Sequence, residues 1–174
     1  MFGINQIYRQ PLWLIWLIML VGILVWCFIC LVMRKRQRIA KVVNVIGLCG
    51  AIFGVLLFTV LKRSFTIGNS SVELRPFYTF VMARENEEYY RTFLMNMFLF
   101  YPVGLFLPFV LRKNNVRRTL LFAAGLSLIV ELDQLIFHTG RCETDDLIAN
   151  VLGCFIGCLA YYLYYGLQRI WTNN

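Results

Sequence analysis

Charged residues are scarce in this sequence. Asp, Glu, Lys and Arg make up only 15% of the 174 residues, whereas 60% of the residues are hydrophobic. A soluble domain carries about 25% charged residues, so this composition excludes a large domain with a water-exposed surface. Several uncharged runs are as long as the stretch of about 20 apolar residues that crosses a bilayer as a helix. The sequence therefore predicts an all-α fold, a polytopic transmembrane helical bundle with about five spans.

The signatures of common catalytic and metal sites are missing as well. The chain has a single histidine, His138, and it has neither a Gly-x-Ser-x-Gly elbow nor a phosphate-binding glycine loop. Of its 6 cysteines, Cys142 lies in a polar loop and the others lie inside apolar runs, where a thiol acts as a small hydrophobe. We therefore predict no disulfide framework, no metal site and no cofactor.

The net charge of +8 raises the question of nucleic-acid binding. However, the Lys and Arg residues gather at the ends of apolar runs and do not form a basic groove with interleaved aromatic residues. This placement is typical of a membrane protein. Nucleic acid is therefore excluded as a partner, and membrane lipid is expected as one.

The apolar runs divide the chain into three parts. Residues 1–61 are expected to hold two transmembrane helices joined by a basic cytoplasmic loop, residues 62–91 to form an extracytoplasmic segment, and residues 92–174 to hold a three-helix core. The predicted spans are Trp13–Met33, Val42–Leu61, Thr92–Leu111, Thr119–Phe137 and Leu147–Tyr165.

The basic residues also predict an orientation. The loops Arg34–Lys41 and Arg112–Arg118 are rich in Lys and Arg and contain no acid. Because such loops stay on the cytoplasmic side, we expect the C-terminus inside and the N-terminus and the loop His138–Asp146 outside. Tyrosines are expected to form an aromatic belt where the last span leaves the membrane. These are Tyr161, Tyr162, Tyr164 and Tyr165.

Two acids, Glu131 and Asp133, interrupt the fourth predicted span. An acid at the centre of a membrane helix costs about 2.5–3.5 kcal/mol, so something should offset this cost. Glu131 shares a polar stripe at helical spacing with Ser127, Gln134 and His138. This stripe must face protein or water.

The fifth predicted span carries a matching stripe of Asp146, Asn150, Gly153 and Gly157. Small residues let helices approach closely, so the last two spans are expected to pair antiparallel with both glycines at their contact. Polar residues from the outer ends of the last three spans and from the loop between two of them would then form one ligand-binding cluster. Its members are Asn96, Glu131, Gln134, Arg141, Asp145, Asp146 and Asn150.

A purely structural interpretation of this cluster stays open at the sequence level. Polar residues between membrane helices often act as hydrogen-bond links worth about 0.6 kcal/mol each. Asp145 and Asp146 could also be first-turn acids, which the helix dipole favours. The convergence of several such residues, with charges of both signs, favours a binding site.

At these residues the sequence resembles the VanZ-like family. The resemblance runs from about Arg75 to Tyr165 and lies in a series of motifs in a fixed order. They are Arg75–Phe77, Asn96–Gly104, Ser127–Gln134, and Glu143–Gly153 followed by Gly157. The resemblance implies a bacterial plasma-membrane protein, in some members linked to low-level resistance to teicoplanin, a lipid-tailed glycopeptide. It implies no settled biochemical reaction.

Our first hypothesis is a non-enzymatic membrane factor that lowers susceptibility to lipoglycopeptides. Its outward-facing cluster would bind a lipid, the drug or a lipid-linked cell-wall precursor, with Arg141 pairing with an anionic group and the acids accepting hydrogen bonds. The alternative is a membrane enzyme acting on a lipid or cell-wall precursor, with the carboxylates as acid/base groups or as ligands for a hard divalent cation. A transport or ion-path protein ranks third, because no inverted repeat is visible.

Overall fold

The computed structural model describes residues 17, 20–22, 24–26, 28, 37–63, 71–111, 116–137 and 141–172. The first predicted span, Trp13–Met33, lies mostly outside the described residues. The elements are, in chain order, α3 (Gln37–Arg63), β1 (Ser71–Glu73), α4 (Tyr78–Met82), α5 (Glu87–Leu111), α6 (Val116–Ile136), β2 (Arg141–Glu143) and α7 (Thr144–Thr172).

Within the described part of the chain, 4 helices are long and apolar enough to cross a membrane. The predicted all-α, multi-span fold is confirmed, and the number of spans is close to the expected one. Helix α5 begins at Glu87, inside the segment predicted to lie outside the membrane. The early start has a local cause, because Glu87 and Glu88 occupy the first turn, where the helix dipole favours acids. An apolar run marks only the hydrophobic part of such a helix.

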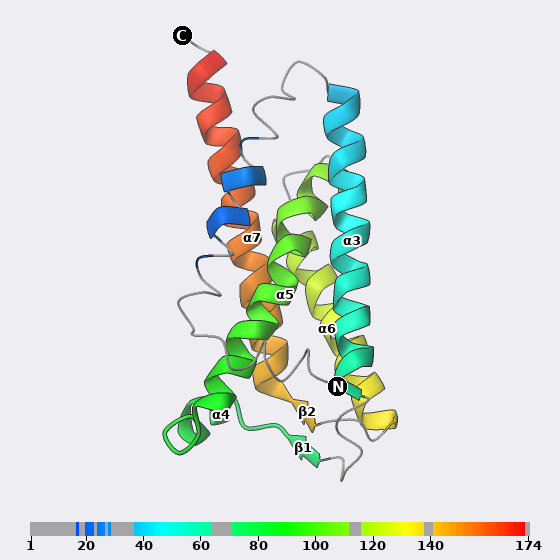
Figure 1. The fold of residues 1–174 in the computed structure, drawn as a ribbon, viewed down its shortest axis with the longest axis vertical. Coiled ribbons are helices and arrows are strands. Elements are labelled where there is room, and N and C mark those ends of the chain that lie inside the picture. The colour runs from blue at the N-terminus through cyan, green and yellow to red at the C-terminus, as the bar shows by residue number, and fades with distance from the viewer. Residues whose placement is uncertain are drawn as a thin grey trace.

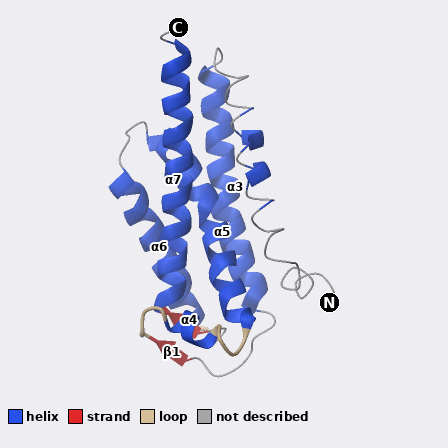
Figure 2. Ribbon diagram, turned by 90° about the vertical axis from the view of Figure 1, so that its left-hand side faces the viewer, coloured by secondary structure: helices blue, strands red, loops and turns tan. Residues whose placement is uncertain are grey.

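The long helices lie side by side, with α5 and α7 parallel to each other and antiparallel to α3 and α6 (Figure 1). One end of the bundle, here called the basic end, carries the first turns of α3 and α6 with Arg38, Lys41, Arg117 and Arg118. The opposite end, here called the sheet end, carries α4, β1 and β2 (Figure 2). The two ends therefore differ in the elements that the structure describes there.

Two short strands that the sequence did not predict connect distant segments at the sheet end. Strand β1 pairs with β2 in parallel, with Ser71 opposite Arg141 and Glu73 opposite Glu143. The pairing ties the polar segment before α4 to the residues immediately before α7. It therefore sets where α7 begins relative to α4.

Glycines bring α5 and α7 into backbone contact. A Cβ atom added at Gly153 would lie 2.7 Å from the Cα of Met97, and one at Gly104 would lie 2.8 Å from the Cα of Cys154. A Cβ at Gly157 would lie 2.7 Å from the backbone nitrogen of Leu105. Gly153 and Gly157 of α7 thus face α5, whereas the sequence suggested that they would face α6. The reason is that Gly104 on α5 lets that helix approach α7 closely.

The aromatic residues in the C-terminal half of α7 pack differently from the expected belt. Tyr161 and Tyr164 are 2% and 7% exposed. The centre of the Tyr161 ring lies 4.5 Å from the centre of the Phe109 ring, in an edge-on arrangement. The centre of the Trp26 ring lies 5.4 Å from the centre of the Tyr164 ring. The predicted belt is therefore wrong for Tyr161 and Tyr164, because these side chains face α5 and the described part of the first predicted span. Tyr165, by contrast, is 43% exposed.

Candidate functional site

A cavity lies between α3, α5, α6 and α7, near the sheet end of the bundle. The centre of a water-sized sphere can occupy about 20 Å³ of this cavity. One water molecule needs about 10–15 Å³ by the same measure. Polar residues and apolar residues share its wall. They are Asn96, Glu131, Gln134, Asp146 and Asn150, with Val55, Phe58, Leu99, Phe100 and Val130.

The polar part of this wall joins three helices, as the helical spacing of the sequence suggested. Asn96 comes from α5, Glu131 and Gln134 from α6, and Asp146 and Asn150 from α7. The part contributed by α3, Val55 and Phe58, had no signal in the sequence because both residues look like ordinary lipid-facing positions. These two side chains close the cavity on the side of α3.

Asn150 is 3% exposed and is held by a contact to α6. Its side-chain Nδ2 donates a hydrogen bond of 2.8 Å to the Oγ of Ser127. Its Oδ1 is buried and has no hydrogen-bond partner among the described residues. A buried polar atom without a partner costs about 1–3 kcal/mol, so this oxygen marks a place where a donor or a cation would be stabilising.

Glu131 is also buried, at 3% exposed. Its Oε2 accepts a hydrogen bond of 3.1 Å from the backbone nitrogen of Glu143 in β2. This bond links the carboxylate in α6 to the strand that precedes α7. It gives Glu131 a structural role in addition to its place in the cavity wall.

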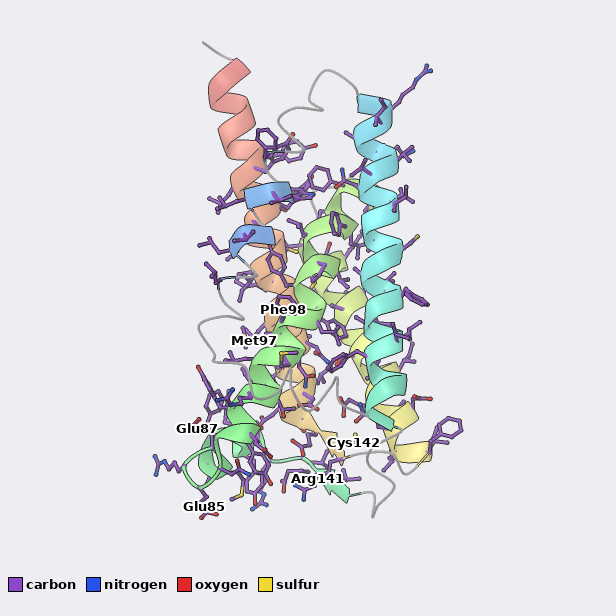
Figure 3. The ribbon with its side chains drawn as sticks, viewed as in Figure 1. Glu85, Glu87, Met97, Phe98, Arg141 and Cys142 are labelled. Atoms are coloured by element: carbon purple, nitrogen blue, oxygen red, sulfur yellow. The ribbon has the colours of Figure 1, made fainter. Side chains whose placement is uncertain are left out.

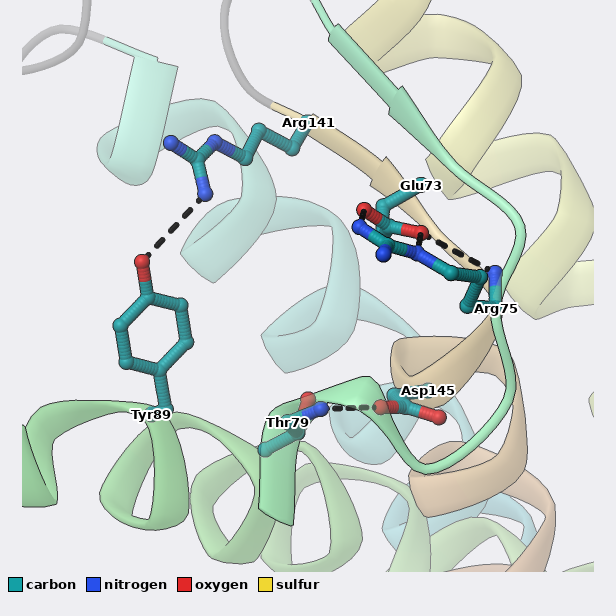
Figure 4. Close-up of polar contacts among 6 residues, drawn as sticks. All are labelled: Glu73, Arg75, Thr79, Tyr89, Arg141 and Asp145. Atoms are coloured by element: carbon teal, nitrogen blue, oxygen red, sulfur yellow. Dashed lines mark hydrogen bonds and ion pairs between the residues drawn. The ribbon is translucent and has the colours of Figure 1, made fainter. Parts of the chain in front are cut away.

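Asp145 does not line this cavity, although the sequence placed it in the cluster. Its Oδ1 accepts a hydrogen bond of 2.5 Å from the backbone nitrogen of Phe77, and its Oδ2 accepts one of 2.6 Å from that of Thr79 (Figure 4). Phe77 has a left-handed backbone, with φ of 63°, which is unfavourable for a bulky residue. Asp145 therefore stabilises a strained turn at the start of α4, and both of its oxygens are engaged within the protein.

Arg141 also lies away from the cavity wall. It is exposed, and its guanidinium donates a hydrogen bond of 3.4 Å to the hydroxyl of Tyr89 (Figure 4). Figure 3 shows Arg141 and its neighbour Cys142 at the sheet end of the bundle. The reason is the strand pairing of β2, which holds Arg141 opposite Ser71 and beyond the helix ends.

An ion pair at the sheet end was not predicted. Arg75 donates hydrogen bonds of 2.8 and 2.7 Å to the two carboxylate oxygens of Glu73, and its guanidinium also lies 4.1 Å from the centre of the Tyr78 ring. The hydrogen bonds from Arg75 lower the pKa of Glu73 to about 2. Glu73 is therefore ionised at any physiological pH, and Arg75 is engaged with it.

The pKa of the Cys142 thiol depends on its burial and on the nearby acids. Burial raises the pKa of this thiol above its ordinary value, and the negative charges of Glu131, Asp146 and Glu143 raise it further.

Among the described residues, no group of three or more His, Cys, Asp or Glu side chains is arranged to hold a metal ion. The chemistry of the cavity wall is thus that of two carboxylates and three side-chain amides.

These features define a class, a membrane protein with several spans and a buried polar cavity between its helices near one end. The sequence matches the VanZ/LLP1 family over residues 45–165, and the chain belongs to this family. The matched range begins inside α3, earlier than the motifs in the sequence indicated.

A curated relative is Protein VanZ from Enterococcus faecium. It is 32% identical to this chain over 74 residues, which cover 42% of this chain and 46% of the relative. The match thus spans about half the length of that protein. No solved structure matches the chain.

Proposed function

We propose that this protein lowers the susceptibility of a bacterial cell to lipoglycopeptides such as teicoplanin. In this proposal it acts in the plasma membrane, with the sheet end facing outward, and it binds a lipid, the drug or a lipid-linked cell-wall precursor. Membership of the VanZ/LLP1 family and the similarity to Protein VanZ support the general role. The separation of the basic end from the sheet end supports the orientation, because basic loops stay in the cytoplasm.

The observation that carries the binding part of the proposal is the cavity wall of Asn96, Glu131, Gln134, Asp146 and Asn150. Polar and ionisable groups are rare inside a membrane and usually serve a function. The space at the centre of the cavity admits only a few atoms. A larger ligand would therefore insert one small polar group, and the rest of it would lie in the surrounding bilayer or at its surface.

The proposal is tested by replacing each acid of the cavity with its isosteric amide. Glu131→Gln and Asp146→Asn keep the shape of the side chain and remove its charge. We expect both variants to lose teicoplanin resistance in a susceptible bacterial host at unchanged abundance. Glu85→Gln is the matched control, because Glu85 is exposed near the sheet end and does not line the cavity (Figure 3).

Wild-type resistance from both amide variants, at matched membrane abundance, would contradict the proposal. The acids of the cavity would then be structural, as is common when a buried charge can be replaced without loss. The functional surface would have to be sought elsewhere, first in the segment 62–91.

A second candidate is a membrane enzyme acting on a lipid or a cell-wall precursor. It is favoured by the presence of two carboxylates, Glu131 and Asp146, in the wall of one cavity, since such pairs serve as acid and base. Mass spectrometry of lipids, precursors and added teicoplanin separates the candidates. A product that forms with the wild type and not with Glu131→Gln would favour the enzyme.

A further inference from the structure

The described residues that line the cavity offer many hydrogen-bond acceptors and no basic side chain. Two carboxylates, of Glu131 and Asp146, and the amides of Asn96, Gln134 and Asn150 face a space that is bordered by none of the Lys, Arg and His side chains the structure describes. Two described arginines of the sheet end have partners outside the cavity, since Arg141 bonds Tyr89 and Arg75 bonds Glu73. Among the described residues, the wall is therefore rich in hydrogen-bond acceptors and carries no basic group.

An independent observation at the same place is the Oδ1 of Asn150. This residue is 97% buried, since its exposed fraction is 3%, and the Oδ1 has no partner among the described residues. Its Nδ2 is already used by Ser127. What the amide still lacks is a hydrogen-bond donor or a cation at the oxygen.

The size of the space restricts what can fill this role. About 20 Å³ is available to the centre of a water-sized sphere, which is enough for one or two small groups and not for a sugar, a phosphate or a peptide. Ligands that are all oxygen atoms suit hard cations and ammonium groups, because both are held by charge and by hydrogen bonds to oxygen. The lining residues that the structure describes include no thiol or imidazole, which would favour a transition metal.

We propose that this cavity binds a small cation through the carboxylates of Glu131 and Asp146 and the Oδ1 of Asn150. The cation is either a free inorganic ion or the primary ammonium of a lipid head group, which present the same chemistry to these oxygens. The inference rests on the proposed function, because it takes the same cavity as the working site and names the chemical class of the group that enters it. It differs from the sequence-based prediction of no metal site and is closer to the cation-ligand role that the sequence left open for the same carboxylates.

The test is the thermal unfolding of the full chain in dodecyl maltoside micelles without added lipid. Choline chloride, whose cation is too bulky for the cavity, is replaced at constant ionic strength by NaCl, KCl or methylammonium chloride, and MgCl₂ is titrated separately. We expect at least one of these cations to raise Tm along a saturating curve. A cation at 100 times its Kd raises the folding equilibrium constant about 100-fold.

The arms of this experiment identify the source of the cation. A Tm that rises with methylammonium alone indicates the ammonium of a head group, whereas a Tm that rises with Na⁺, K⁺ or Mg²⁺ indicates a free ion. Equal Tm in choline and in every small cation would overturn the inference, and this series needs only the wild-type protein. Where they fold, Glu131→Gln and Asp146→Asn should lose the cation dependence while Glu85→Gln retains it. The same dependence in all three variants would also overturn the inference.

The resistance assay distinguishes this inference from the proposed function. A cation effect that disappears in Glu131→Gln, together with wild-type resistance of that variant, supports the cation site and contradicts the proposed role of the cavity. Loss of resistance in Glu131→Gln without any cation effect in the wild type supports the proposed function and overturns the cation site.

Discussion

The contact between α5 and α7 gives a sharp prediction for Gly153→Ala. The added Cβ would lie 2.7 Å from both the Cα and the carbonyl carbon of Met97. Carbon atoms pack favourably at about 3.5–4.0 Å, so the helices would have to separate by about 1 Å. The obstacle is backbone and cannot rotate away, as a side chain could.

The size of the effect follows from two opposing contributions. Inserting a group into a well-packed contact costs about 1–3 kcal/mol, and a rigid backbone obstacle falls at the upper end of this range. Alanine is favoured over glycine inside a helix by about 1 kcal/mol. We therefore expect Gly153→Ala to lower the free energy of unfolding by about 2 kcal/mol.

Two other glycines provide matched controls. A Cβ at Gly125 in α6 meets nothing within 4 Å, so Gly125→Ala should be neutral or slightly stabilising. A Cβ at Gly47 in α3 would lie 2.7 Å from the ring of Phe106. That ring can move, so Gly47→Ala should be intermediate.

The assay is titration of the protein with dodecyl sulfate in mixed micelles, with helix content followed by circular dichroism. The expected order of stability loss is Gly153→Ala, then Gly47→Ala, then Gly125→Ala. Equal losses at positions 153 and 125 would refute the reasoning. The α5–α7 backbone contact would then not determine the stability of the bundle.

Other predictions concern the sheet end. Asp145→Ala leaves the backbone nitrogens of Phe77 and Thr79 without acceptors, so amide hydrogen exchange of Tyr78–Met82 should accelerate, with a loss of about 1–3 kcal/mol; unchanged exchange would show that the turn holds itself. Because the pKa of Cys142 is raised, its alkylation in micelles should be slow at neutral pH and should accelerate as pH rises towards that pKa. Glu131→Gln removes a nearby negative charge, so it should lower the pKa of Cys142 and accelerate alkylation at pH 8. An unchanged rate would show that the charge of Glu131 does not influence the thiol. A membrane-impermeant maleimide should label intact cells through Cys142 and not in Cys142→Ser, whereas labelling only after permeabilisation would reverse the proposed orientation.

Part of the candidate site was predictable because helical periodicity is local. Glu131 and Gln134 lie one turn apart, as do Asp146 and Asn150, so each pair shares a face before any tertiary contact is known. A short connection makes α6 and α7 neighbours, and that brings the two faces to one cavity. The positions of Arg141 and Asp145 were not predictable in this way, because each depends on a residue more than fifty positions away.

The sequence by itself determined that the chain crosses a membrane several times and roughly where each helix lies, because an uncharged run of sufficient length is a local property of composition. Only the tertiary structure decided which surfaces meet. Whether Gly153 packs on α5 or α6 depends on the rotation of α7, and the length of a run carries no information about that rotation. The role of Asp145 and the outward position of Arg141 depend in the same way on segments that only folding brings together, the turn at Phe77 and the strand that begins at Ser71.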